Sequence, residues 1–112
     1  MVFITLNCAE GMPTSDIRVR QAVAYCLNRE ELTEIASNGS GTAAYNLSTP
    51  LVNYYDDVCD HFETNVETAN DLLSQAGYSE NNPVELTLIC MSAQTDWIAA
   101  CEIMKEELEQ SY

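Results

Sequence analysis

The sequence predicts one helix-rich α/β domain with a small mixed sheet. Apolar residues recur at helical spacing in four stretches, while residues 2–7 and 84–90 are rich in the residue types that favour strands. A chain of 112 residues has room for one modest core, so a single domain spanning residues 1–112 is expected. Because neither short strand is stable alone, we expect both of them in one sheet.

The first two helices are predicted end to end. Asp16 can accept hydrogen bonds from the free N–H groups of a first turn. A single apolar stripe follows it, formed by Val19, Ala22, Val23 and Cys26. Asn28 can cap the second helix, with Glu31 three residues later as in a capping box. Asn38 and the glycine after it end this second helix.

A third and a fourth helix are predicted nearer the C-terminus. Either Thr64, through a capping box, or Asn65 can begin the third helix, and Gly77 ends it. Its apolar stripe consists of Val66, Ala69, Leu72, Leu73 and Ala76. Thr95 or Asp96 begins the fourth helix. Its apolar stripe consists of Trp97, Ala100, Cys101, Met104 and Leu108.

The stretch between the second and third helices, residues 39–61, shows no helical or strand periodicity and is predicted to be a long loop. Its acidic end contains Cys59 and His61, which makes it a candidate for metal coordination. However, the run lacks the glycine and the terminal glutamate of an EF-hand loop, and it offers only two soft ligands. We therefore expect an acidic turn in solvent, with no metal and no cofactor.

The chain is strongly acidic, with four Lys and Arg against 18 Asp and Glu and a net charge of −14. Nucleic acid and anionic membrane surfaces are therefore poor partners, because both need a basic footprint. No apolar stretch approaches the ~20 residues of a membrane span. No secretory signal is recognisable, and Asn7 precedes Cys8 where a lipoprotein cleavage site has a small residue. We expect a piece that is not membrane-inserted and from which a signal has been cut.

The five cysteines include no C-x-x-C pair, which argues against a zinc knuckle or a thioredoxin-like motif. Cys26 and Cys101 both lie on apolar helical stripes. A buried free cysteine behaves as a small hydrophobic residue. We therefore expect these two residues to be buried and unpaired.

Two stretches resemble a known family. Residues 16–32 read Asp-Ile-Arg-Val-Arg-Gln-Ala-Val-Ala-Tyr-Cys-Leu-Asn-Arg-Glu-Glu-Leu and resemble the signature of the extracellular solute-binding proteins of ABC importers, in the oligopeptide, dipeptide and nickel family (family 5). Asn28 stands where that signature has Asp, and both residues cap well. Residues 69–78 resemble the family's Ala-x-x-Leu-Leu-x-x-Ala-Gly-Tyr motif, and a Leu-Thr-Leu strand follows at residues 86–88.

The resemblance implies the two-lobe, type II architecture of periplasmic binding proteins, with this chain as part of the second, C-terminal lobe. It implies a solute-binding component of an ABC import system that captures a peptide or a similar small solute in a cleft between the lobes. The implied partner is the cognate ABC permease. The implied location is outside the cytoplasm, on a parent protein anchored by lipid. A nickel complex or a sugar stays open as the ligand.

The loop between the last strand and the last helix is the expected ligand-contacting segment. Ligands of open α/β sheets lie beyond the carboxyl ends of the strands, and the resemblance implies that the corresponding family loop borders the cleft. The candidate residues are Met91, Ser92, Gln94, Thr95 and Asp96. The alternative is that these residues only cap the helix.

Two other classes of function stay open. The acidic surface could belong to a structural or protein-interaction domain that has no small-molecule ligand. The chain could also be a piece of an enzyme whose catalytic residues lie elsewhere. The sequence contains no Gly-x-Ser-x-Gly, P-loop or His-Glu-x-x-His motif, so we assign no catalytic residue and expect a binding protein that is not an enzyme.

Overall fold

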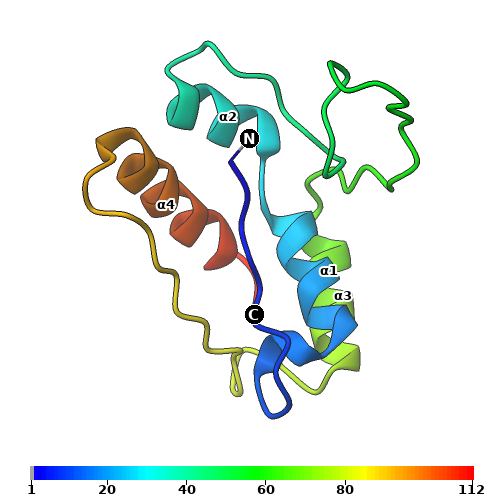
Figure 1. Cartoon of the computed structure of the whole chain (residues 1–112). Helices are drawn as coiled ribbons and strands as arrows, with labels where there is room; N and C mark the ends of the chain where they lie inside the picture. Colours follow the sequence, from blue (N-terminus) through cyan, green and yellow to red (C-terminus); the bar gives the residue numbers. More distant parts are fainter. Residues whose placement is uncertain (1) are drawn as a thin grey trace.

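The computed structural model describes residues 2–112, which form four α-helices and one 3₁₀ helix. In chain order these are η1 (Pro13–Ser15), α1 (Ile17–Cys26), α2 (Arg29–Ser37), α3 (Val66–Gln75) and α4 (Thr95–Leu108). α1 packs along α3, and α2 packs on α4, so the helices form two pairs (Figure 1). All four predicted helices are present, which confirms the helix-rich part of the fold prediction.

Three helices begin at the side-chain caps that the sequence predicts. Asp16, Asn28 and Asn65 each accept a hydrogen bond from a backbone N–H of the first turn, at 2.8, 3.3 and 3.0 Å. Each bond satisfies one of the N–H groups that a helix start leaves without a partner. Of the two candidates for α3, Asn65 is therefore the cap. The Thr64 hydroxyl donates instead to the carbonyl of Leu27, at 3.2 Å.

The ends of α2 and α3 also follow the sequence. α2 ends at Asn38, which adopts the left-handed conformation with φ of 51°. α3 is followed by Gly77 with φ of 95°, a conformation that glycine adopts without steric cost. The Tyr78 N–H then bonds back to the carbonyl of Leu73 at 2.9 Å, closing the last turn. Local signals therefore set the bounds of these helices.

The core lies between α1 and α3. Its buried residues are Val19, Ala22, Cys26, Ala69 and Leu73, and tyrosine, leucine and valine side chains pack around them. α2 contains no buried residue, and α4 contains only one, Ala100. The two helix pairs therefore differ sharply in how much apolar surface they remove from water.

The predicted sheet does not form within residues 2–112. Segments 2–7 and 84–90 are extended but lie in no strand, and the only β-bridge among the described residues joins Ser79 to Asn82. Val84 directs its N–H to the carbonyl of Tyr112 at 3.1 Å, so its backbone donor is paired with the C-terminal end rather than with segment 2–7. Phe3 and Ile89 are 70% and 86% exposed. A strand needs a neighbouring strand for its backbone groups, and this arrangement supplies none.

The cysteine prediction is only partly right about burial. Cys26 is buried in the core, whereas Cys101 on α4 is half-buried. Cys101 is more exposed than Cys26 because its helix, α4, packs on α2 rather than in the core. No residue of α2 is buried, so the contact between these two helices is loose. Among the described residues, none of the helices has the length and apolar character needed to cross a membrane.

Candidate functional site

The predicted ligand-contacting loop is an open turn that leads into α4. Its backbone turns between Met91 and Gln94, where the Gln94 N–H donates to the Met91 carbonyl at 3.3 Å. Thr95 and Asp96 form the first turn of α4. The five candidate residues are all exposed, and Met91 is 61% exposed. The structure therefore places all five residues in one exposed segment that leads into the N-terminus of α4.

The start of α4 lacks a side-chain cap. Gln94 occupies the N-cap position, but its side chain makes no capping hydrogen bond. Asp96 places a negative charge in the first turn, which suits the positive end of the helix dipole. The side chain of Gln94 therefore does not cap the helix, as the alternative interpretation of this loop would require.

A pocket of about 200 Å³ lies at the start of α2, away from the predicted loop. Its lining consists of Leu27, Arg29, Glu30, Tyr45, Phe62, Glu63 and Thr64. Typical ligand sites enclose roughly 300–1,000 Å³, so this pocket is too small to enclose a peptide. It can hold water or a small polar group.

Arg29 and Tyr45 shape this pocket. The Arg29 guanidinium donates to the Phe62 carbonyl at 3.0 Å and lies over the Tyr45 ring, with Cζ 5.3 Å from the ring centroid. The Tyr45 hydroxyl donates to Glu30 Oε1 at 2.6 Å. This bond lowers the pKa of Glu30 and raises the pKa of Tyr45. The polar groups of the pocket are thus largely satisfied by one another.

The loop beyond Tyr45 is closed by Asn46. The Asn46 amide donates to Asp57 Oδ1 at 2.6 Å, and its carbonyl accepts from the Cys59 N–H at 3.1 Å. His61 contacts Asp57 Oδ1 at 2.9 Å and stacks on the Tyr45 ring at 4.1 Å. Hydrogen bonds from His61 and Asn46 lower the pKa of Asp57. The acidic run is therefore a hydrogen-bonded loop closure.

No cluster of three or more His, Cys, Asp or Glu side chains within residues 2–112 is arranged to hold a metal ion. His61 is occupied with Asp57 and with the Tyr45 ring.

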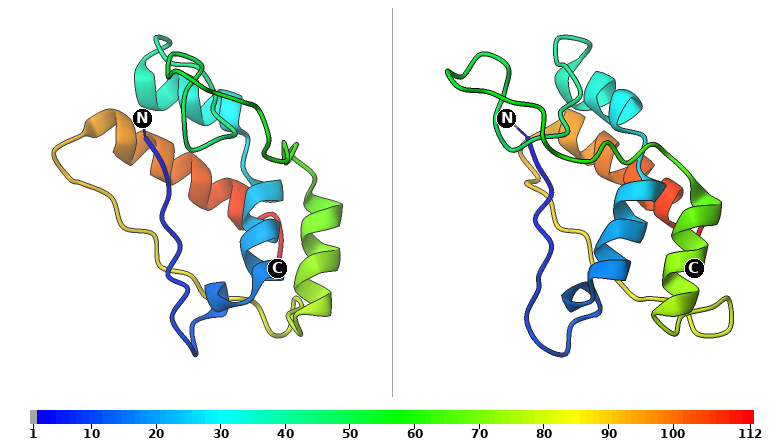
Figure 2. Two further views of the ribbon diagram at one scale, coloured as in Figure 1. Left: turned by 45° about the vertical axis from the view of Figure 1, so that its right-hand side comes forward. Right: turned by 90° about the vertical axis from the view of Figure 1, so that its right-hand side faces the viewer.

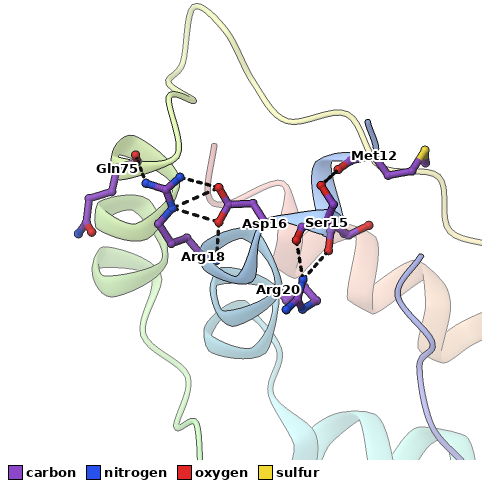
Figure 3. A network of polar contacts seen from close by, with 7 residues as sticks. Met12, Ser15, Asp16, Arg18, Arg20 and Gln75 are labelled. Atoms are coloured by element: carbon purple, nitrogen blue, oxygen red, sulfur yellow. Dashed lines mark hydrogen bonds and ion pairs between the residues drawn. The ribbon is translucent and has the colours of Figure 1, made fainter. Parts of the chain in front are cut away.

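The residues of the signature make a polar network around the start of α1 (Figure 3). Arg18 Nε lies 3.0 Å from Asp16 Oδ1, and Arg18 Nη2 lies 2.6 Å from Oδ2. Another nitrogen of the same guanidinium donates to the carbonyl of Gln75 at the end of α3. The hydrogen bonds from Arg18 lower the pKa of Asp16 to about 2. Arg18 thus joins the cap of α1 to the last turn of α3.

Arg20 is used in the same manner. Its Nη1 donates to the carbonyls of Thr14 and Ser15, both at 2.9 Å, while the Ser15 hydroxyl donates to the Met12 carbonyl at 2.7 Å (Figure 3). Arg18 and Arg20 are therefore engaged in contacts that hold α1, η1 and α3 together. Their role in this structure is positional.

Comparison with known proteins identifies the family. Residues 1–111 match the model of the bacterial extracellular solute-binding proteins, family 5, middle region. The chain belongs to this family. It is 32% identical over 78 residues to a heme-binding protein A of Haemophilus influenzae and 31% identical over 74 residues to a dipeptide-binding protein of Escherichia coli. An oligopeptide-binding protein AppA of Bacillus subtilis is 36% identical over 69 residues.

These matches cover 70%, 66% and 60% of the chain but only 14%, 14% and 13% of the three relatives. No solved structure matches the chain significantly. The family 5 chain therefore spans a small part of the length of the curated relatives that it matches. Membership confirms the resemblance that the two motifs indicate.

The pocket at the start of α2, here called the Tyr45 pocket, is not predicted by the sequence pattern of this family 5 chain. Its residues come from α2 and from two ends of a loop that has no periodicity. A signal does exist at Asn28, because a capping residue places the next two residues, Arg29 and Glu30, in the first turn of α2. Nothing in the sequence pattern shows that Tyr45 and Phe62 reach that turn.

Proposed function

We propose that this chain is part of the second lobe of a two-lobe, type II solute-binding protein that captures a peptide for an ABC importer. The family match over residues 1–111 carries the proposal. Relatives named as dipeptide-binding and oligopeptide-binding proteins support a peptide as the ligand. The cognate permease is the partner, and the complete protein acts outside the cytoplasm, held by a lipid anchor.

In this proposal, the loop of residues 91–96 forms part of the cleft wall. The side chains of Ser92, Gln94 and Thr95 are exposed and carry donors and acceptors that suit a peptide backbone. The start of α4 has N–H groups without a side-chain cap, and such groups favour a carboxylate. A single exposed loop buries too little of a ligand to bind it strongly, so the opposing lobe is required.

The proposal also gives the two extended segments a role. Segments 2–7 and 84–90 carry strand-forming residues but have no ladder partner within residues 2–112. In the complete protein, we place them in a small mixed sheet with neighbouring strands from the rest of the lobe. Their exposed side chains, among them Phe3 and Ile89, would then become covered.

Isothermal titration calorimetry on the full-length protein tests the function. Di- to pentapeptides should bind with micromolar affinity, while residues 1–112 alone should bind more weakly than ~1 mM, because one wall of the site is missing. Combined replacement S92A, Q94A and T95A in the full-length protein should weaken binding about tenfold or more. The matched control is N81A with N82A, at an exposed turn on another part of the chain. Micromolar binding by residues 1–112 alone would contradict the two-lobe mechanism.

The heme-binding relative favours a second ligand class. That relative is 32% identical over 78 residues, as similar as the dipeptide-binding one. Titration of the full-length protein with hemin, followed by the absorbance of the bound porphyrin, distinguishes the two. Saturable hemin binding without peptide binding would replace the peptide proposal. If neither ligand binds, the acidic chain is better explained as part of a protein-interaction domain.

A further inference from the structure

Asn38 and Gly39 form the only Asn-Gly pair in the chain, and they follow the last residue of α2. Both residues are exposed. Figures 1 and 2 show the end of α2 and the start of the following loop at the periphery of the molecule. An Asn-Gly pair is chemically labile, because glycine has no Cβ to hinder its nitrogen as that nitrogen approaches the asparagine side chain. The pair is therefore a candidate site of covalent modification.

The native turn holds this pair in a conformation that cannot react. The Gly39 N–H donates to the Glu34 carbonyl at 2.9 Å, so the nitrogen is engaged in closing the helix. Asn38 has φ of 51° and ψ of 44°. Ring closure needs the Gly39 nitrogen on the same side of the Cα–C bond as the Cβ of Asn38, and this ψ places it nearly opposite. The last turn of α2 must therefore open before the pair can react.

That turn is weakly held. α2 contains no buried residue, and its capping bond at Asn28 is 3.3 Å long. Nothing lies within 4 Å of the place where a Cβ of Gly39 would stand, so no other part of residues 2–112 braces that side of the turn. Local opening costs little free energy where few apolar contacts are lost. The reactive conformation is therefore accessible without unfolding of the α1–α3 core.

We propose that Asn38 is a site of spontaneous deamidation that is controlled by opening of the last turn of α2. The Gly39 nitrogen loses its proton to hydroxide and attacks Cγ of Asn38. The bond from this nitrogen to Cγ forms, the bond from Cγ to Nδ2 breaks, and ammonia leaves with a proton taken from water. Water then opens the five-membered succinimide at one of its two carbonyls and yields aspartate or isoaspartate. No oxidant or reductant takes part.

Either product changes the end of α2. A carboxylate replaces a neutral amide beside the negative end of the helix dipole, which is unfavourable. Isoaspartate also adds a methylene to the main chain, so the Gly39 N–H no longer meets the Glu34 carbonyl in the same geometry. Deamidation should therefore loosen α2 from α4 and leave the α1–α3 core unchanged. The reaction does not depend on the proposed function.

Peptide mapping of the 112-residue chain tests the proposal. The chain is incubated in mildly alkaline buffer, and samples are acidified at intervals and cut after glutamate. Cleavage after Glu34 and Glu63 yields peptide 35–63, which also contains Asn46 and Asn53 as internal references. Fragmentation in the mass spectrometer should place the mass gain of amide-to-carboxylate conversion on residue 38. Enzymatic methylation of isoaspartate then measures the share of that product.

The control by the helix end is tested by comparing rates. The rate at Asn38 should be at least about tenfold higher in concentrated urea than in native buffer, because the turn is open in the unfolded chain. A36G weakens the end of α2 and should raise the native rate about threefold, while the rate in urea stays the same. A24G makes the same change at a half-buried alanine near the end of α1. This matched control should keep the native rate of the wild-type chain.

Equal rates at Asn38 in native buffer and in urea would overturn the proposal, because the folded turn would then give no protection. A faster reaction at Asn46 or Asn53 than at Asn38 would also overturn it. So would a native rate that A36G fails to raise, or that A36G and A24G raise equally.

Discussion

The α1–α3 pair and the α2–α4 pair are built from similar helices but are held in different ways. Between α1 and α3, five residues are buried, and Arg18 connects the cap of α1 to the end of α3. Between α2 and α4, only Ala100 is buried, and the polar connection is one hydrogen bond of 3.2 Å from the Asn28 N–H to Glu107. Helix-forming sequence is therefore not enough to make a stable unit. We expect the half with the larger buried core, α1 with α3, to be the self-sufficient one.

The difference also explains what the family signature does in this chain. Asp16, Arg18 and Arg20 lie at the pair with the larger core, and their hydrogen bonds go to carbonyls and to one another. The exposed loop proposed to contact ligand belongs to the other pair, at the start of α4. Structural residues and candidate ligand residues are thus carried by separate regions.

The largest expected effect is in the α1–α3 core. Leu73 is 2% exposed, and L73A should lower the free energy of unfolding by about 2–5 kcal/mol, through lost burial and the cavity left behind. Urea denaturation followed by circular dichroism measures the loss. Leu51, which is 95% exposed, provides the control with the same chemical change. L51A should change the free energy of unfolding by less than about 0.5 kcal/mol. Similar losses for L73A and L51A would contradict the claim that the α1–α3 core carries most of the stability.

The next effect compares the caps of α3 and α2. N65A should destabilise the chain by about 1 kcal/mol because it removes the hydrogen bond to the first turn. N28A should lower the free energy of unfolding by less than N65A does. The capping bond of Asn28 is longer than that of Asn65, 3.3 Å against 3.0 Å, and α2 contains no buried residue. N65D is the control, because aspartate caps as well as asparagine. A larger loss for N28A than for N65A would show that α2 and α4 are the more strongly coupled pair.

Glu107 provides a smaller effect with a defined pH dependence. Desolvation raises its pKa in the folded chain, and the hydrogen bond from Asn28 opposes the shift. The pKa of Glu107 is thus higher in the folded chain than in the unfolded chain. For such a group, the favourable contribution to the free energy of unfolding is fully present below the unfolded-state pKa, and it is lost as the pH rises through the folded-state pKa. At pH 7 the ionised Glu107 therefore opposes folding. E107Q should raise stability slightly at pH 7 and leave it unchanged at pH 3.

A stability gain for E107Q at both pH values would indicate a cause other than charge. E106Q is the matched control, because the neighbouring side chain is exposed. It should leave the pH dependence of unfolding as it is in the wild-type chain.

The smallest effect concerns the titration of one carboxyl group. Asp16 has a pKa of about 2, and the ordinary value is 3.8. Because the folded pKa is lowered, the stabilising contribution of the group is present above the unfolded pKa and is lost as the pH falls through about 2. In R18Q, the pKa of Asp16, followed by NMR at its carboxyl carbon, should rise from about 2 towards the ordinary 3.8, and the backbone N–H of residue 18 should keep part of the lowering. R20Q is the control, because the charge of Arg20 lowers the pKa of Asp16 less than Arg18 does. In R20Q, the midpoint of the Asp16 titration should stay near its wild-type position.

Local features of this fold could be predicted from the sequence, and long-range ones could not. The caps at Asp16 and Asn28 and the stop at Asn38 depend on residues within one turn, so their patterns predict them correctly. The sheet prediction depends on which segment pairs with which, and residues 84–90 find no strand partner in residues 2–112. A strand-like pattern shows a tendency to pair but not the presence of a neighbour.

The candidate sites follow the same rule. The sequence predicts the loop of residues 91–96 as a connection before a helix, and the structure shows an exposed turn there. Its contact with a ligand stays a prediction. The Tyr45 pocket could not be predicted, because it depends on Arg29 meeting Tyr45 and the Phe62 carbonyl across a loop without periodicity.

Amide hydrogen exchange tests most directly whether one half of the chain is self-sufficient and the other is completed by the rest of the protein. In the 112-residue chain, we expect strong protection for residues 19–26 of α1 and 69–75 of α3, and little protection for residues 2–7 and 85–90. In the full-length protein, the two extended segments should gain protection by about tenfold or more as they join a sheet, while α1 and α3 change little. Equal protection of both extended segments in the short chain and in the full-length protein would contradict the account.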